Sequence, residues 1–333
     1  MIRAKNALDA LIAGLRGRLT DKADWQAVIA LANHTLLTPA LFSSLEQAGQ
    51  MQRVPSDVRE YLQFIHGCNR ERNLRLRLQL NEAVTALNKR GIVPVLLKGA
   101  VMLFLSRPAH PPSRMTSDLD LGVAASEEAA AQACLEELGY RQVPEGRGMS
   151  RPQDAGVLEL RPYRTNGFES PKLIQQDDLR VKIPPAQSRA LHWIVHDLLK
   201  EGDYWRGRIE LRHMHDLAQL AESDEIDWTA LRASVPDKNT RNALDTQLLA
   251  LHYFFGTNIP AECAQRPIIR LQHWRRVFAS RHPVFGAPLR LAGSLLWGTR
   301  RLSRIHELAR RDPVYLARRI GLLLLNKDLR SKI

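Results

Sequence analysis

The part of the chain that decides the fold is IVPVLLKGAVMLFL at residues 92–105, followed by RMTSDLDLGV at residues 114–123. The run at residues 92–97 is short, apolar and rich in β-branched side chains, which predicts a strand. Lys98 and Gly99 then end the run, and a helical pattern of apolar residues follows. We therefore predict a strand, a glycine turn and a helix in close succession.

The second stretch contains the clearest strand pattern of the sequence, because polar and apolar residues alternate from Asp118 to Val123. Alternate side chains of a strand share one face, so Asp118 and Asp120 would project together, about 7 Å apart at their α-carbons. Two carboxylates on one rigid face can coordinate a hard cation. A second predicted strand, at residues 157–160, carries Glu159, which is available as a third ligand.

Helical periodicity surrounds this core, before it up to Gly91 and after it from Pro185. Between these regions Ser126 is predicted to cap a helix that ends near Gly139, and residues 161–180 are predicted to form a loop. The predicted fold class is α+β, with a small mixed sheet flanked by helical regions. The predicted domains are an N-terminal helical region at 1–90, a core at 91–183, a helical domain at 184–263 and a basic helical extension at 264–333.

Composition excludes several classes of protein. The 333 residues are 44% hydrophobic and 25% charged, and their mean hydropathy is −0.28. These values are typical of globular proteins and not of disordered chains. No apolar run approaches the roughly 18 residues of a membrane span, and the N-terminus resembles an amphipathic helix more than a secretory signal, so we expect a cytoplasmic protein. Three scattered cysteines fit neither a disulfide framework nor a metal site, and we expect them to be buried.

The positive charge is concentrated at the C-terminal end of the chain. Residues 264–333 hold sixteen Lys and Arg against three acids, a net charge of +13, whereas residues 1–263 have a net charge of zero. Arginine pairs alternate there with apolar residues, which predicts amphipathic helices. Three uses stay open: packing with the arginines in water, contact with an anionic membrane surface, or binding of RNA phosphates.

The core motifs resemble those of a known family. The stretch VLLKGA at residues 95–100, followed by RMTSDLDL at residues 114–121, is similar to the nucleotidyltransferases of the DNA polymerase β superfamily with the pattern LLKGA, short helix, R-x-x-x-D-x-D-L. A looser likeness extends over residues 20–260. The chain departs from the wider superfamily in lacking a Gly-Ser pair at the turn and in having Glu159 where an aspartate is usual.

The resemblance implies an α+β nucleotidyltransferase core that binds an NTP, such as ATP, with Mg²⁺ or Mn²⁺. It would transfer the nucleotidyl group to an acceptor hydroxyl and release pyrophosphate. By the same resemblance, the catalytic metal ligands would be Asp118, Asp120 and Glu159, and Glu159 would help to deprotonate the acceptor. The nucleotide would be held by Lys98, Gly99, Arg114 and Ser117, with the backbone amides of the glycine turn around the triphosphate.

The sequence does not identify the acceptor. A small hydroxyl-bearing metabolite or sugar, a peptide or protein side chain, and RNA all stay open. Two alternative functions are a toxin that modifies tRNA and a catalytically inactive protein that binds nucleotides or acts as a scaffold.

Overall fold

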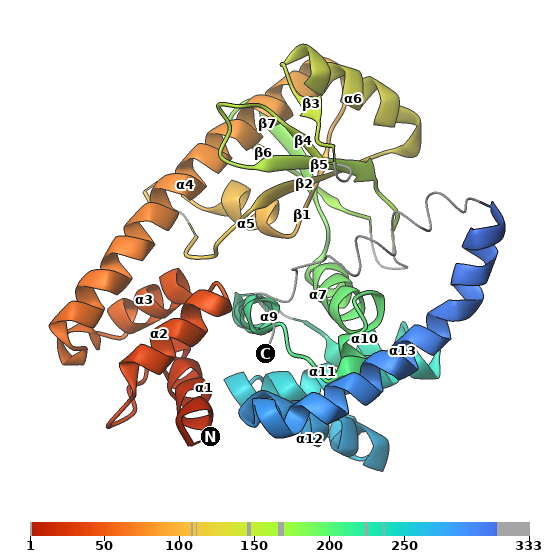
Figure 1. Cartoon of the computed structure of the whole chain (residues 1–333). Helices are drawn as coiled ribbons and strands as arrows, with labels where there is room; N and C mark the ends of the chain where they lie inside the picture. Colours follow the sequence, from red (N-terminus) through yellow and green to blue (C-terminus); the bar gives the residue numbers. More distant parts are fainter. Residues whose placement is uncertain are drawn as a thin grey trace. The chain divides into compact units, whose positions relative to one another are not determined.

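The computed structural model describes residues 2–107, 109–110, 112–144, 148–165, 170–223, 226–235 and 237–311. The chain divides into two compact units. The first, Thr38–Arg189, contains the sheet and is called the sheet unit; the second, Met1–Leu37 with Ala190–Ile333, is called the helical unit. The predicted α+β class is confirmed (Figure 1). The finer division into four segments stays a prediction.

The sheet has seven strands in the order β3-β4-β5-β2-β1-β7-β6. Their bounds are β1 Val95–Leu97, β2 Asp118–Val123, β3 Arg141–Gln142, β4 Gly148–Ser150, β5 Val157–Pro162, β6 Lys172–Gln176 and β7 Leu179–Ile183. β2 lies at the centre, antiparallel to β1 and parallel to β5. Its register sets Asp120 opposite Leu97 on one side and opposite Glu159 on the other. Three separate parts of the sequence therefore meet at one point of the sheet.

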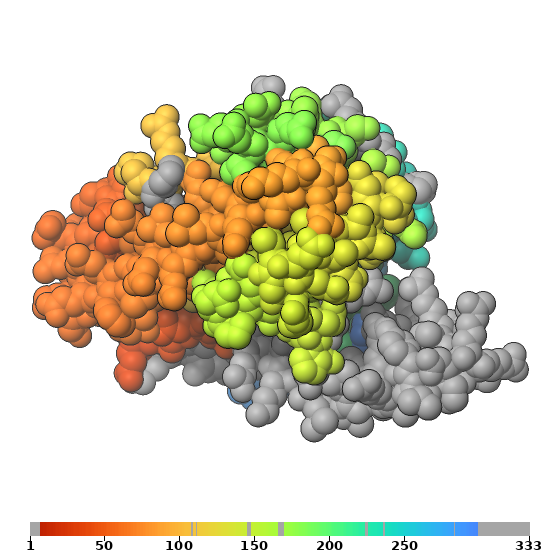
Figure 2. Space-filling view, turned by 90° about the horizontal axis from the view of Figure 1, so that it is seen from above, coloured from red at the N-terminus to blue at the C-terminus, as the bar shows by residue number. Residues whose placement is uncertain are grey.

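Helices of the sheet unit complete its core. They are α3 Thr38–Gln47, α4 Ser56–Lys89, α5 Gly99–Leu105 and α6 Glu128–Glu137. The apolar half of the β2 alternation, Leu119 and Leu121, is fully buried together with Leu76 and Leu80 of α4. α4 is the longest of these helices and lies beside the sheet (Figure 1). The side of α4 that faces away from the sheet is exposed. There its side chains form a continuous surface with those of later strands and helices (orange beside yellow and green in Figure 2).

Three local predictions are wrong. Residues 161–180 do not form a loop throughout: Arg161 belongs to β5, and β6 with β7 forms a hairpin whose second strand pairs with β1. Ser126 is not the cap of α6, because a 3₁₀ turn at Ala125–Glu127 comes first and the Glu127 carboxylate accepts the Ala124 N–H at 3.2 Å. Cys134 and Cys263 are buried as expected, but Cys68 is exposed.

The helical unit is built from helices before and after the sheet unit. They are α1 Ile2–Leu15, α2 Trp25–His34, α7 Ala186–Val195 (which contains the boundary between the units), α8 Asp203–Arg206, α9 Leu211–Ser223, α10 Trp228–Ala233, α11 Lys238–Phe255, α12 Pro267–Arg281 and α13 Pro283–Arg311. In the described part of the chain, none of the helices combines the length and apolar character that a membrane crossing needs. The end of the predicted basic extension, residues 312–333, lies outside the described residues.

Candidate metal centre

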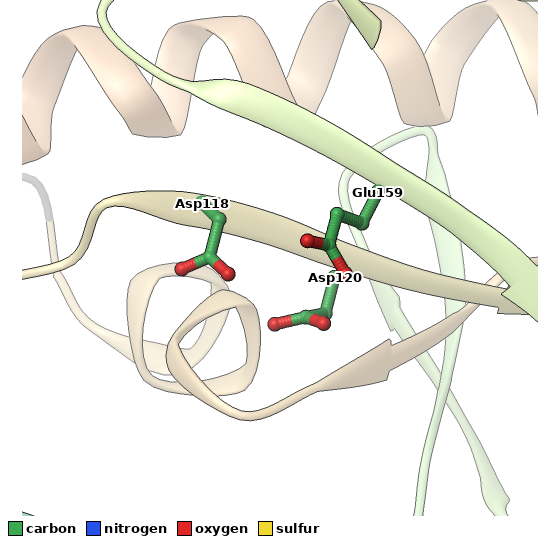
Figure 3. A group of neighbouring side chains, drawn as sticks. All are labelled: Asp118, Asp120 and Glu159. Carbon is green, nitrogen blue, oxygen red and sulfur yellow. The ribbon is translucent and has the colours of Figure 1, made fainter. Parts of the chain in front are cut away.

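Three carboxylates gather on β2 and β5. Asp118 and Asp120 project from the same face of β2, and Glu159 projects from the facing position of β5 (Figure 3). One carboxylate oxygen from each lies within 4.8 Å of the others. Asp120 is almost fully buried, with 1% of its surface exposed. An all-oxygen donor set of this size suits a hard divalent cation. The structure thus brings together the three acids that the sequence singled out.

Two cationic side chains contact the same carboxylate. Lys98 Nζ lies 3.0 Å from Asp120 Oδ1, and Arg161 Nη2 contacts that oxygen as well. Arg161 Nη2 is also 3.6 Å from Glu159 Oε2. Among the described residues, Asp120 Oδ1 has no partner with hydrogen-bond geometry, so these ion pairs alone balance its charge. Burial of a carboxylate is costly unless it is paired, so the two cations stabilise Asp120 in its buried position.

Burial acts on both cations. It lowers the pKa of Lys98, although the charge of Asp118 opposes the shift. It lowers the pKa of Arg161 in the same way. Desolvation disfavours the charged form of each side chain. The two cations are therefore placed where an anionic ligand would stabilise them.

Lys98 is held in an unusual backbone conformation. It connects β1 to α5 with φ 48° and ψ −123°, in the positive-φ region that favours glycine. A non-glycine residue in such a region costs on the order of 1–3 kcal/mol and persists only where the surroundings impose it. The neighbouring residue Leu97 pairs with Asp120 across the sheet, which places Lys98 beside the buried acid.

Gly99 and Arg114 pack closely together. A Cβ at Gly99 would lie 2.8 Å from Arg114 Nη1 and 2.9 Å from Thr116 Cγ2, so only glycine leaves room for these side chains. Arg114 is buried, and its Nη1 donates to Thr116 Oγ1 at 3.4 Å. Ser117 is exposed directly before β2, and its hydroxyl donates to Asp118 Oδ1 at 2.8 Å. These residues lie around the acids; their contacts with a nucleotide stay predictions.

Polar side chains of α4 hold the chain where it enters both acid-bearing strands. Asn73 Nδ2 donates to Arg114 O and Pro112 O, each at 2.8 Å. Gln79 Nε2 donates to Gly156 O at 2.9 Å, and Gln79 Oε1 accepts the Gly156 N–H at 3.3 Å. These backbone segments lead directly into β2 and β5. Because buried amides are costly unless paired, the bonds fix the ends of the two strands next to each other.

Sequence reasoning missed Arg161 and the amides of α4. Arg161 follows Glu159 by two residues. If the strand predicted at residues 157–160 had been extended past Leu160, alternation would have placed both side chains on one face. Asn73 continues the buried stripe of Leu76 and Leu80 on α4 at helical spacing. A polar residue on an apolar stripe is the signal that could have identified it.

The α+β sheet unit thus presents three carboxylates on neighbouring strands that could hold a divalent cation. The family described as an uncharacterised nucleotidyltransferase matches residues 21–256. The match covers well over half of the chain, which therefore belongs to this nucleotidyltransferase family. No curated protein and no solved structure matched the chain.

Proposed function

We propose that this protein is a metal-dependent nucleotidyltransferase of the polymerase β type. It would transfer NMP from an NTP to an acceptor hydroxyl and release pyrophosphate. The observation that carries the proposal is the triad of Asp118, Asp120 and Glu159, whose oxygens lie within 4.8 Å of one another beside two cationic side chains. Membership of a nucleotidyltransferase family implies that the substrate is an NTP.

The donor set fits Mg²⁺ or Mn²⁺, because every available ligand atom is a carboxylate oxygen and the acids stand on paired strands. Asp118, Asp120 and Glu159 would hold the cation. Bound there, it would offset the phosphate charge and stabilise the attacking and leaving oxygens. Ser117 would orient Asp118 through their 2.8 Å hydrogen bond.

Lys98 and Arg161 would bind the triphosphate. Both are largely buried, with 18% and 26% of their side chains exposed, and both contact Asp120. When an NTP arrives, its phosphate oxygens would replace the carboxylate as their partner. The Arg161 guanidinium can form two parallel hydrogen bonds to a phosphate, whereas Lys98 contributes a compact charge. Arg114, packed against Gly99, would add a further phosphate contact.

Glu159 would receive the proton of the acceptor hydroxyl. Its side chain is 40% exposed, so an acceptor that enters from solvent can reach it, whereas Asp120 is buried. The acceptor could be a small hydroxyl-bearing molecule, a protein side chain or RNA, including tRNA. Each of these offers the hydroxyl that the reaction requires.

One observation favours a second candidate function. Lys98 and Arg161 already balance the charge of Asp120, so this buried acid can persist without a cation. A protein that binds nucleotides through these two side chains, without catalysis, would have the same arrangement. The two functions differ in whether nucleotide binding requires a divalent cation.

Calorimetry distinguishes them by measuring ATP binding in Mg²⁺ and in EDTA. We expect the parent protein to bind ATP in Mg²⁺, and the double variant Asp118→Asn/Asp120→Asn to lose that binding, because the cation loses two ligands. The control, Asp177→Asn/Asp178→Asn, removes the same charge from an exposed turn of the sheet unit and should bind as the parent does. Equal ATP binding in EDTA, or by the variant in Mg²⁺, would support the inactive nucleotide-binding protein instead.

A further inference from the structure

The outward side of α13 is apolar over its first four turns. The exposed residues between Pro283 and Gly298 are Val284, Phe285, Ala287, Pro288, Leu291, Ala292, Leu295 and Leu296. The five large side chains among them are between 56% and 76% exposed. At 3.6 residues per turn, all eight positions fall within one half of the helix circumference. They form a continuous apolar strip, which we call the α13 strip.

Packing on the other side of the helix fixes this orientation. A Cβ at Gly286 would lie 2.7 Å from Ala279 Cα of α12, and a Cβ at Gly293 would overlap the carbonyl oxygen of Trp205 in α8. Arg290 is directed to the same side, where its Nη1 donates to Ala279 O at 3.2 Å. Figure 1 shows α13 alongside α12. Because the glycine side approaches its neighbours so closely, the α13 strip is turned outward by the packing itself.

A strip of this kind marks a contact surface. Single apolar residues are common on protein surfaces, but contiguous patches of large ones indicate a binding partner. The charge of the sequence segment that contains the strip indicates which partner. No acidic residue occurs from Ala264 to His306, and the strip is followed by Arg300, Arg301 and Arg304 in the sequence.

We propose that the α13 strip docks on an anionic lipid surface. An apolar helix face in a strongly basic segment is typical of helices that lie in a membrane interface, where apolar side chains enter the lipid and arginines contact the headgroups. RNA fits less well, because binding to phosphates requires cations on the contact face, and the only arginine of residues 283–298 is directed inward. The charge of +13 in residues 264–333 complements anionic lipid and would repel a second copy of the same segment.

Vesicle flotation with the full-length protein tests the proposal. The probes are vesicles of phosphatidylcholine alone and of phosphatidylcholine mixed with phosphatidylglycerol. We expect the protein to float with the anionic vesicles only, and less at high salt. The double variant Leu291→Glu/Leu295→Glu should bind at least about tenfold more weakly, because charged side chains cannot enter the lipid.

A matched control is available on α4. Phe64 and Leu78 are exposed to a similar extent, 67% and 69%, and lie outside both the α13 strip and the acidic centre. Phe64→Glu/Leu78→Glu should bind vesicles as the parent does. Should the strip variant not fold, as judged by its thermal melting, Val284→Glu provides a second test, because this side chain is 76% exposed.

Four results would overturn the proposal. The first is failure to bind anionic vesicles, and the second is equal binding by the strip variants. The third is a stable dimer that the strip variants dissociate, which would assign the strip to a second copy. The fourth is that the protein does not bind vesicles and that the strip variants melt at a lower temperature than the control variant. This result would assign the strip to contact with residues 312–333 of this chain.

Discussion

Replacement of Arg161 by methionine should change metal binding and nucleotide binding in opposite directions. Arg161 contacts Asp120 and lies 3.6 Å from Glu159 Oε2, so it competes with any cation for these two acids. The methionine side chain fills similar space without charge. Without its competitor, Mn²⁺ should bind the triad more tightly in the absence of nucleotide. Mg·ATP should bind more weakly, because a phosphate contact is lost.

The size of each effect follows from the geometry. Two unit charges about 4 Å apart interact by about 1 kcal/mol in water and about 4 kcal/mol near a protein surface. Since the Glu159 side chain is 40% exposed and that of Arg161 is 26% exposed, a value toward the lower end applies. A gain of about 1.4 kcal/mol corresponds to about tenfold tighter Mn²⁺ binding. Loss of a charged hydrogen bond to phosphate, about 1.5–3 kcal/mol, corresponds to about ten- to hundredfold weaker ATP binding.

Titration calorimetry measures both affinities on the same preparations. The control is Arg164→Met, the same substitution at an exposed arginine just beyond β5, and it should change neither affinity. Unchanged Mn²⁺ affinity in Arg161→Met would show that the guanidinium does not compete for the triad. A parallel loss of both affinities with a lower melting temperature would show that Arg161 supports the fold instead.

Two further predictions concern backbone strain and pH. Lys98→Gly should be about 1 kcal/mol more stable to denaturant than Lys98→Ala, because both remove the ammonium but only glycine accommodates φ 48°; equal stability would contradict the strain. Burial, aided by the charge of Arg276, lowers the pKa of the half-buried His273 to about 4. Since the unfolded histidine titrates near 6.5, stability should fall as the pH drops through 6.5 toward 4, by about 1–2 kcal/mol between pH 7 and 5. Denaturant melts should show this loss in the parent but not in His273→Gln, and an equal loss in both would assign it to other groups.

Local patterns in the sequence predict the elements that carry the acids. The alternation at residues 118–123 matches the bounds of β2, because one face of that strand packs on α4 and the other holds carboxylates. The order of strand, turn and helix around Lys98 is likewise as predicted, although the strand covers only Val95–Leu97 and not the whole of residues 92–97. In both cases the pattern that predicts the element lies within a few neighbouring residues, and hydrophobic periodicity is a property of such short segments.

Contacts between distant parts of the chain were not predictable in this way. β7 pairs with β1 across more than eighty residues, and the loop predicted at residues 161–180 includes its first two residues, Leu179 and Arg180. Arg161 acquires its position only from the register of β5 beside β2. Asn73 and Gln79 are polar residues on a helix that become buried because they bond to backbone near the acids. Each depends on a pairing that no short segment of sequence specifies.

The most direct test of the central claim follows the label of an NTP. The protein is incubated with Mg²⁺ and cell extract, using NTP labelled at the α-phosphate in one reaction and at the γ-phosphate in another. The proposed reaction transfers the α-label to an acceptor and releases the γ-label in pyrophosphate, and Asp118→Asn/Asp120→Asn abolishes the transfer. Transfer of the γ-label, no transfer from any NTP, or transfer that survives the loss of both aspartates would contradict the claim.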